Sequence, residues 1–167
     1  MALMDRVDWG WGKALGVAAA LAFLPPLLTR LVIGQAFYQT GAGKLSNPEG
    51  VAAFFGSLGI PFPELNAAFV SRVEYYGGLL LIAGLATRIV AFLLSSTMVV
   101  ALMTADREGF VAALRGSGDS GLTDVVPVVF LLFLVWLLIH GPGVVSLDAA
   151  VARWRGKPAA GRGQPAP

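Results

Sequence analysis

Ionisable side chains occur at regular spacing in two long apolar stretches of the sequence. Arg30 and Lys44 belong to the first stretch, and Glu74 and Arg88 belong to the second. In each stretch the two charges are about four helical turns apart, or about 21 Å. A charge at mid-depth in a membrane helix costs about 2.5–3.5 kcal/mol, so such groups usually face protein or water. Grouped in this way, they could hold a small anion or relay protons.

Lys44 and Glu74 are the two charges that we expect to meet. If the first helix runs outward and the second runs back, both residues lie toward the outer side at similar depth. A solitary Glu74 beside Tyr75 and Tyr76 would have to take up a proton. We therefore predict an ion pair between Lys44 and Glu74, with Arg72 as a further positive charge near the outer mouth.

Small residues accompany these charges at helical spacing. The two stripes are Arg30, Gly34, Phe37, Gly41 and Lys44, and Glu74, Gly77, Gly78, Leu81, Gly84 and Arg88. Glycines on such a stripe let two helix backbones approach closely. Two interpretations stay open: the stripes pack two helices around one buried ion pair, or they form a site for a ligand or for protons.

Composition predicts an integral membrane protein. The chain has 167 residues, of which 56% are hydrophobic and 13% are charged. Its mean hydropathy is +0.74, and soluble domains contain only about 45–50% apolar residues. Four spans of about 20 residues with their loops would use nearly the whole length.

Several kinds of chemistry are excluded by residue counts. Cysteine is absent, so the chain forms no disulfide and no cysteine-ligated iron–sulfur cluster. His140 is the single histidine, which excludes a bis-His haem within the chain, and we expect no metal site. The basic residues are scattered, so we expect no nucleic-acid partner. A redox centre would have to belong to a protein partner or be a diffusible carrier such as a quinone.

We predict an all-α membrane protein, a bundle of four transmembrane helices at about 26–44, 66–87, 89–104 and 125–139. A short surface helix is expected in the first outer loop after Asn47, and a polar loop at 105–122. Thr123 and Asp124 should cap the fourth span, with Pro127 in its first turn. Gly141 and Pro142 should end it.

The ends of the chain fall outside this bundle. Residues 1–24 are expected to form an amino-terminal segment with an interfacial helix at 14–24, which is too short to span. One kinked helix running from Lys13 to Gly41 is the alternative. Residues 25–150 form the membrane domain, and 151–167 a disordered basic tail.

Basic residues also predict the orientation. Placing both termini in the cytoplasm puts most Lys and Arg residues on the inner side, as the positive-inside rule requires. The inner set is Arg6, Lys13, Arg88, Arg153, Arg155, Lys157 and Arg162, and the outer set is Lys44, Arg107 and Arg115. We therefore expect a multi-pass protein of the inner (plasma) membrane.

Several runs of sequence resemble the DoxX family of small bacterial and archaeal membrane proteins. They are the residues at 30–34, 43–45, 54–61 and 74–88, and the closing Gly141-Pro142-Gly143 and Ser146-Leu147-Asp148. The resemblance covers about 28–149 and implies a four-helix membrane bundle. Arg30, Lys44, Glu74 and Arg88 are the polar positions that carry over, and the family establishes no catalytic role for them.

What the resemblance implies about activity is broad. Relatives include a membrane subunit associated with thiosulfate:quinone oxidoreduction, and others are linked to redox-stress complexes or to maturation of partner proteins. We therefore expect an accessory or anchor subunit of a quinone-linked membrane complex, without autonomous catalysis and without a covalently bound cofactor. A structural or assembly partner with no ligand is the alternative, and a small-solute or proton pathway ranks third. The expected partners are the lipid bilayer and further protein subunits.

Overall fold

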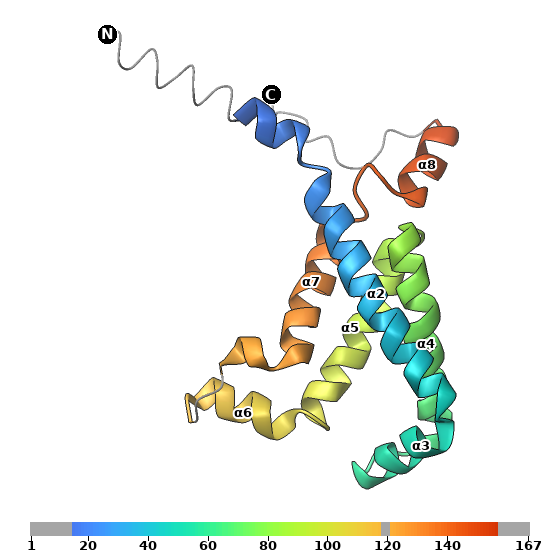
Figure 1. The fold of residues 1–167 in the computed structure, drawn as a ribbon, viewed down its shortest axis with the longest axis vertical. Coiled ribbons are helices and arrows are strands. Elements are labelled where there is room, and N and C mark those ends of the chain that lie inside the picture. Colours follow the sequence, from blue (N-terminus) through green and yellow to red (C-terminus); the bar gives the residue numbers. More distant parts are fainter. Residues whose placement is uncertain (1–14, 118–120, 157–167) are drawn as a thin grey trace.

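The computed structural model describes residues 15–117 and 121–156, and within these ranges it contains helices and no strand. The all-α prediction is therefore confirmed for the described part of the chain. Figure 1 shows long helices crossing one another, with shorter helices at both ends. They are α2 (Leu24–Ser46), α3 (Pro48–Ser57), α4 (Pro63–Ala83), α5 (Thr87–Met103), α6 (Arg107–Arg115), the 3₁₀ turn η1 (Leu122–Asp124), α7 (Val126–His140) and α8 (Leu147–Trp154).

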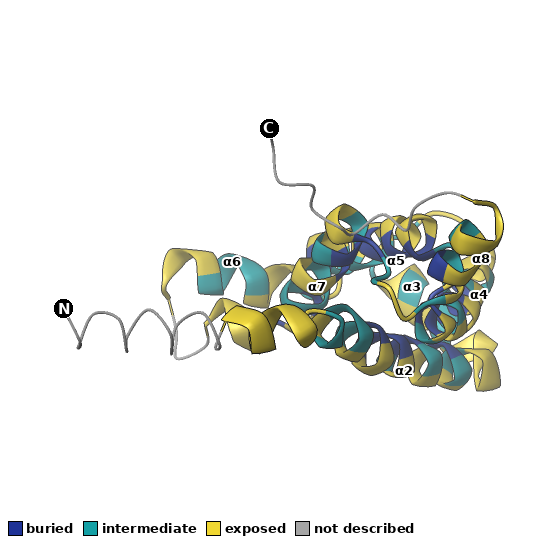
Figure 2. Ribbon diagram, turned by 90° about the horizontal axis from the view of Figure 1, so that it is seen from above, coloured by how far each residue is buried: buried dark blue, intermediate teal, exposed yellow. Residues whose placement is uncertain are grey.

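One apolar core joins the four longer helices. Helix α2 packs mainly on α4, and α5 packs mainly on α7. Figure 2 shows the buried residues of these helices turned toward one another. The core consists of Ile33 and Phe37 of α2, Leu81 of α4, Val90, Ala91 and Leu94 of α5, and Leu134 and Leu137 of α7.

The sequence explains where these helices begin and end. Proline lies in the first turn of α2, α3, α4 and α7, where a missing N–H costs no hydrogen bond. Helix α3 is capped by Asn47, whose side chain accepts a hydrogen bond of 3.1 Å from the Gly50 amide. Helix α4 ends at Gly84, whose φ of 68° suits glycine in the left-handed region.

The four long predicted segments are found as helices, with shifted ends. The stretch at 26–44 lies within α2, 66–87 overlaps α4, 89–104 overlaps α5, and 125–139 corresponds to α7. The surface helix predicted after Asn47 is α3. Pro127 lies in the first turn of α7, and the helix stops at Gly141, as expected.

Three local predictions need correction. The polar loop predicted at 105–122 contains the helix α6, which begins after Asp106 and ends at Gly116 with a φ of 64°. Thr123 and Asp124 do not cap α7, because they belong to η1, and the Asp124 carboxylate accepts from the Gly121 amide instead. Helix α8 reaches Trp154, inside the segment 151–167 that was predicted to be disordered.

Near the amino terminus, residues 15–20 are helical and residues 21–23 form a turn before α2. One continuous helix through this region is therefore not what the structure shows. Predictions for residues 1–14 and for the tail beyond 156 fall outside the described residues.

Judged by length and hydropathy together, no single described helix is sufficient to cross a membrane. Helices α5 and α6 satisfy the test as a pair, with a bend of 78° between them.

Candidate functional site

The predicted contact between Lys44 and Glu74 is present. Lys44 Nζ lies 2.5 Å from Glu74 Oε1, and the contact joins the end of α2 to the middle of α4. The Glu74 side chain is 2% exposed and the Lys44 side chain is 31% exposed. Glu74 Oε2 is buried and has no hydrogen-bond partner in the described part of the protein. The pair thus has a closed end at the carboxylate and an open end at the ammonium group.

Glycines bring α2 and α4 into backbone contact beside this pair. A Cβ added at Gly41 would lie 2.3 Å from the Tyr75 amide nitrogen, and one added at Gly78 would lie 2.4 Å from that of Tyr38. One added at Gly34 would meet the Gly78 carbonyl oxygen at 2.8 Å. Residues later in α2 contact residues earlier in α4, so the two helices are antiparallel. The close approach sets the depth at which Lys44 meets Glu74.

Tyrosines form an aromatic cluster next to Glu74. The ring centroids of Tyr38 and Tyr75 are 5.1 Å apart, which joins α2 to α4 a second time. Tyr75 and Tyr76 are also 5.1 Å apart and meet edge to face. Such aromatic pairs add about 0.5–1.5 kcal/mol beyond the area that they bury. The Tyr38–Tyr75 pair thus helps to hold the two helices in register beside the ion pair.

A hollow of about 470 Å³ opens beside Lys44, where α2 meets α3. Its lining combines polar groups with two phenylalanines: Thr40, Gly43, Lys44, Asn47, Gly50, Val51, Phe54 and Phe55. Such a combination of an apolar wall with a few polar groups is typical of small-molecule sites. Lys44 therefore both contacts Glu74 and lines this hollow.

Arg30 lies at the opposite end of α2 and belongs to a different cluster. Its side chain is 1% exposed, and Nη2 donates a hydrogen bond to the Val145 carbonyl. A Cβ on Gly84 would collide with the guanidinium, so only glycine leaves room for Arg30 there. The arginine thus joins α2 to the α4–α5 turn and to the segment before α8.

Arg88 is exposed and donates a 3.2 Å hydrogen bond to the Ile139 carbonyl of α7. The four charges that the sequence singled out therefore occupy separate places: Lys44 and Glu74 are paired, whereas Arg30 and Arg88 each bind the carbonyl of another segment. Arg30 and Arg88 therefore lie outside the contact between Lys44 and Glu74.

Arg72 also lies elsewhere. It donates a 2.8 Å hydrogen bond to the Ala68 carbonyl of its own helix. It lines an apolar groove between α4 and α5 together with Phe69, Tyr76 and Leu93. Arg72 is not among the residues around the hollow beside Lys44. Arg72 and Lys44 therefore line different hollows.

Asp148 has a structural role that the sequence analysis did not predict. Its Oδ1 accepts a 2.8 Å hydrogen bond from the Ala86 amide, and its Oδ2 accepts one of 2.9 Å from the Thr87 amide. These amides begin α5 and have no partner within that helix. Asp148 of α8 therefore caps α5 across the fold, next to Arg30.

We expect Asp148→Ala to lower the free energy of unfolding by about 1–2 kcal/mol, because two amides lose their acceptor. Thermal unfolding in detergent measures this loss. Asp124→Ala is the matched control, because that exposed carboxylate accepts one bond, from Gly121. Equal losses in the two variants would mean that Asp148 does not stabilise the α4–α5 turn.

In the described ranges, no group of three His, Asp or Glu side chains is close enough together to hold a metal ion.

Comparison with known proteins places the chain in a family. Residues 26–107 match the DoxX family model, a range that contains Arg30, Lys44, Glu74 and Arg88. Over 78 residues the chain is 40% identical to a Bacillus subtilis protein named "Putative oxidoreductase CatD". That alignment covers 47% of the chain and 57% of the relative, so it spans little more than half the relative's length.

A second relative is matched over more of its length. Over 139 residues the chain is 31% identical to an uncharacterised membrane protein of Mycobacterium tuberculosis, covering 77% of the chain and 83% of the relative. No solved structure matches the chain. The chain therefore belongs to the DoxX family of membrane proteins.

Proposed function

We propose that this protein is an accessory or anchor subunit of a quinone-linked redox complex in the membrane. The hollow beside Lys44 receives the quinone headgroup in this proposal. The observation that carries it is the ion pair itself: a buried carboxylate, Glu74, is paired with Lys44, which also lines the hollow between α2 and α3. The name of the Bacillus subtilis relative supports the link to oxidoreduction.

The lining of the hollow suits a quinone ring. Lys44 supplies a charged donor for a ring carbonyl, and the Thr40 hydroxyl and the Asn47 side chain lie in the same lining. Phe54 and Phe55 supply apolar contact for the ring. The headgroup is therefore held by one charge-assisted hydrogen bond and by aromatic packing.

The chain's own contribution is to bind the headgroup and to handle protons. A quinone held there would be reduced to a quinol by two electrons from a redox centre on a partner subunit and by two protons from the surrounding water. Lys44 would orient the headgroup by donating to a ring oxygen. Glu74, in contact with Lys44, would be the acid–base group that passes protons toward the ring.

The proposal includes a topology. The longer helices α2, α4, α5 and α7 cross the inner membrane, and both termini are cytoplasmic. The excess of basic residues assigned to that side supports this orientation. Lys44 and Glu74 then lie toward the outer half of the bilayer.

Replacing Glu74 by glutamine tests the function. We expect quinone-dependent turnover of the assembled complex to fall about a hundredfold, the lower end of the usual range for a proton-transfer group. The abundance of the complex should not change, because glutamine keeps the shape of the side chain. Glu64→Gln is the matched control, since Glu64 is an exposed acid in the first turn of the same helix.

A structural or assembly partner with no ligand is the second candidate. The close glycine contacts between α2 and α4 favour it, because helix packing accounts for them without any ligand. Under this alternative, Glu74→Gln lowers abundance and turnover in the same proportion.

A further inference from the structure

Helix α6 is set across the end of the bundle. It follows α5 after a bend of 78°, so it lies roughly parallel to the membrane surface if α5 crosses the bilayer. Figure 1 shows it at the same end of the molecule as α3. Seen along the bundle in Figure 2, α6 projects sideways beyond α7. Part of the helix therefore lies beside the protein, where lipid would surround it.

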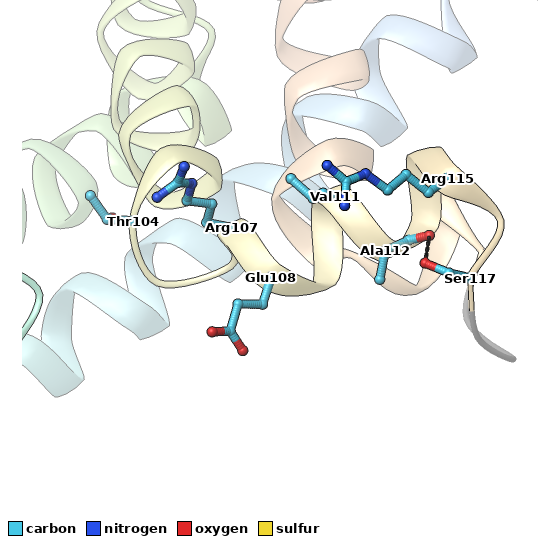
Figure 3. A pocket seen from close by; sticks show the side chains of 7 residues that line it. All are labelled: Thr104, Arg107, Glu108, Val111, Ala112, Arg115 and Ser117. Carbon is cyan, nitrogen blue, oxygen red and sulfur yellow. Dashed lines mark hydrogen bonds between the residues drawn. The ribbon is translucent and has the colours of Figure 1, made fainter.

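The positive and negative side chains of α6 lie on different sides of the helix. Figure 3 shows the guanidinium groups of Arg107 and Arg115 on the side toward α5 and α7, with Val111 between them, and Glu108 pointing the opposite way. In a membrane, that places both cations on the bilayer side of the helix and the carboxylate on the water side. A helix that lies on a membrane usually keeps all its charged side chains on the water side, so the position of the two arginines needs a partner in the headgroup layer.

A hollow of about 580 Å³ lies along this helix. Its lining consists of Thr104, Arg107, Glu108, Val111, Ala112, Arg115 and Ser117, so it carries two cations and one carboxylate. Among the described residues, no carboxylate lies within salt-bridge distance of Arg107 or Arg115, and both side chains are exposed. The lining thus has an excess of one positive charge, and within the described residues neither arginine is paired with Glu108.

The same helix carries apolar side chains that a lipid would cover. Leu114 is 59% exposed, and Phe110 is partly exposed. Helix α6 therefore carries cations and exposed apolar side chains together. At the membrane surface it would lie at the depth of the lipid phosphates, so it complements an anionic phospholipid better than a soluble anion.

We propose that Arg107 and Arg115 bind the headgroup phosphates of anionic phospholipids and fix α6 at the membrane surface. The site is independent of Lys44 and Glu74. Arginine guanidinium groups match phosphate oxygens with paired hydrogen bonds, and Leu114 and Phe110 rest against the acyl chains.

Titrating the purified full chain with phosphatidylglycerol in mild detergent tests this site. The readout is the rise in thermal unfolding temperature, with phosphatidylcholine and inorganic phosphate as comparison arms. Each basic residue near an anionic surface contributes about fivefold in affinity, so the double variant Arg107→Gln/Arg115→Gln should bind phosphatidylglycerol about thirtyfold more weakly. Glu108→Gln is the matched control on the same helix and should bind at least as well as the unmodified chain.

The variant Arg107→Lys/Arg115→Lys keeps the charges but loses the paired hydrogen bonds, so its affinity should lie between those of the unmodified chain and the glutamine variant, which separates charge from any effect on folding. The proposal is overturned if phosphatidylcholine or inorganic phosphate gives the same temperature rise, or if the glutamine variant binds like the unmodified chain. If the glutamine variant keeps its lipid affinity but loses a co-purifying subunit, α6 binds a protein partner and the lipid proposal is wrong.

Discussion

Replacing Gly41 by alanine is expected to separate α2 from α4 and to deplete the folded protein. The added Cβ would lie 2.3 Å from the Tyr75 nitrogen and 2.6 Å from its Cα. Both are backbone atoms, so no side-chain rotation relieves the contact. Overpacking usually costs about 1–3 kcal/mol, and we expect at least the upper value here. Thermal unfolding in detergent and membrane abundance measure the loss.

Gly43→Ala is the matched control on the same helix. A Cβ at Gly43 has nothing within 4 Å, so alanine meets open space. It should stabilise the helix by up to about 1 kcal/mol, because alanine has the higher helix propensity. Similar unfolding temperatures for the two variants would contradict the close packing of α2 on α4.

Lys44→Met is expected to cost about 2–3 kcal/mol, because it leaves the Glu74 carboxylate buried without its partner. A fully buried pair would cost about 3–5 kcal/mol, and the 31% exposure of Lys44 reduces the loss. The double variant Lys44→Met/Glu74→Leu should recover most of the stability, since it removes both charges together. Chemical or thermal unfolding of the two single variants and the double variant gives the coupling free energy. A coupling near zero would mean that the contact does not stabilise the fold.

Exchanging the two charges separates the candidate functions. The variant Lys44→Glu/Glu74→Lys keeps an ion pair at the same depth, so stability should largely return. If the pair only fixes helix packing, turnover of the complex returns as well. If Lys44 binds a headgroup at the hollow, turnover stays low, because a carboxylate then faces a ring carbonyl.

The contact between Lys44 and Glu74 could be predicted because three features agreed. Charges of opposite sign, at matched distances along two neighbouring helices, came with glycines on the same stripes. A single charge is costly in apolar surroundings, so Lys44 and Glu74 were expected to contact each other. The sequence did not separate Arg30 and Arg88 from this pair, because their partners are backbone carbonyls of Val145 and Ile139.

Helix geometry explains why Arg72 and Glu74 face different neighbours of α4. It is two residues before Glu74, and two residues on a helix differ by about 200° around the axis. Glu74 faces α2, so Arg72 faces the groove between α4 and α5. Proximity along the chain is therefore the wrong criterion, and the angle around the helix would have corrected it.

Helices α6 and α8 were not predicted, because their sequence signals are weaker. The charges of α6 and the glycines that follow it suggested a loop, although Gly116 is also a signal for the end of a helix. For α8, Ser146 was a usable signal, because its hydroxyl accepts a 3.1 Å hydrogen bond from the Ala149 amide. The capping of α5 by Asp148 had no local signal, since the bonded residues are far apart in the chain.

Infrared difference spectroscopy of the assembled complex tests most directly whether Glu74 handles protons at a quinone site. The measurement compares the complex with oxidised and with reduced quinone, for the unmodified chain, Glu74→Gln and Glu64→Gln. The account predicts a carboxyl band that changes on reduction in the unmodified chain and in Glu64→Gln and is missing in Glu74→Gln. Identical difference spectra for the unmodified chain and Glu74→Gln would contradict it.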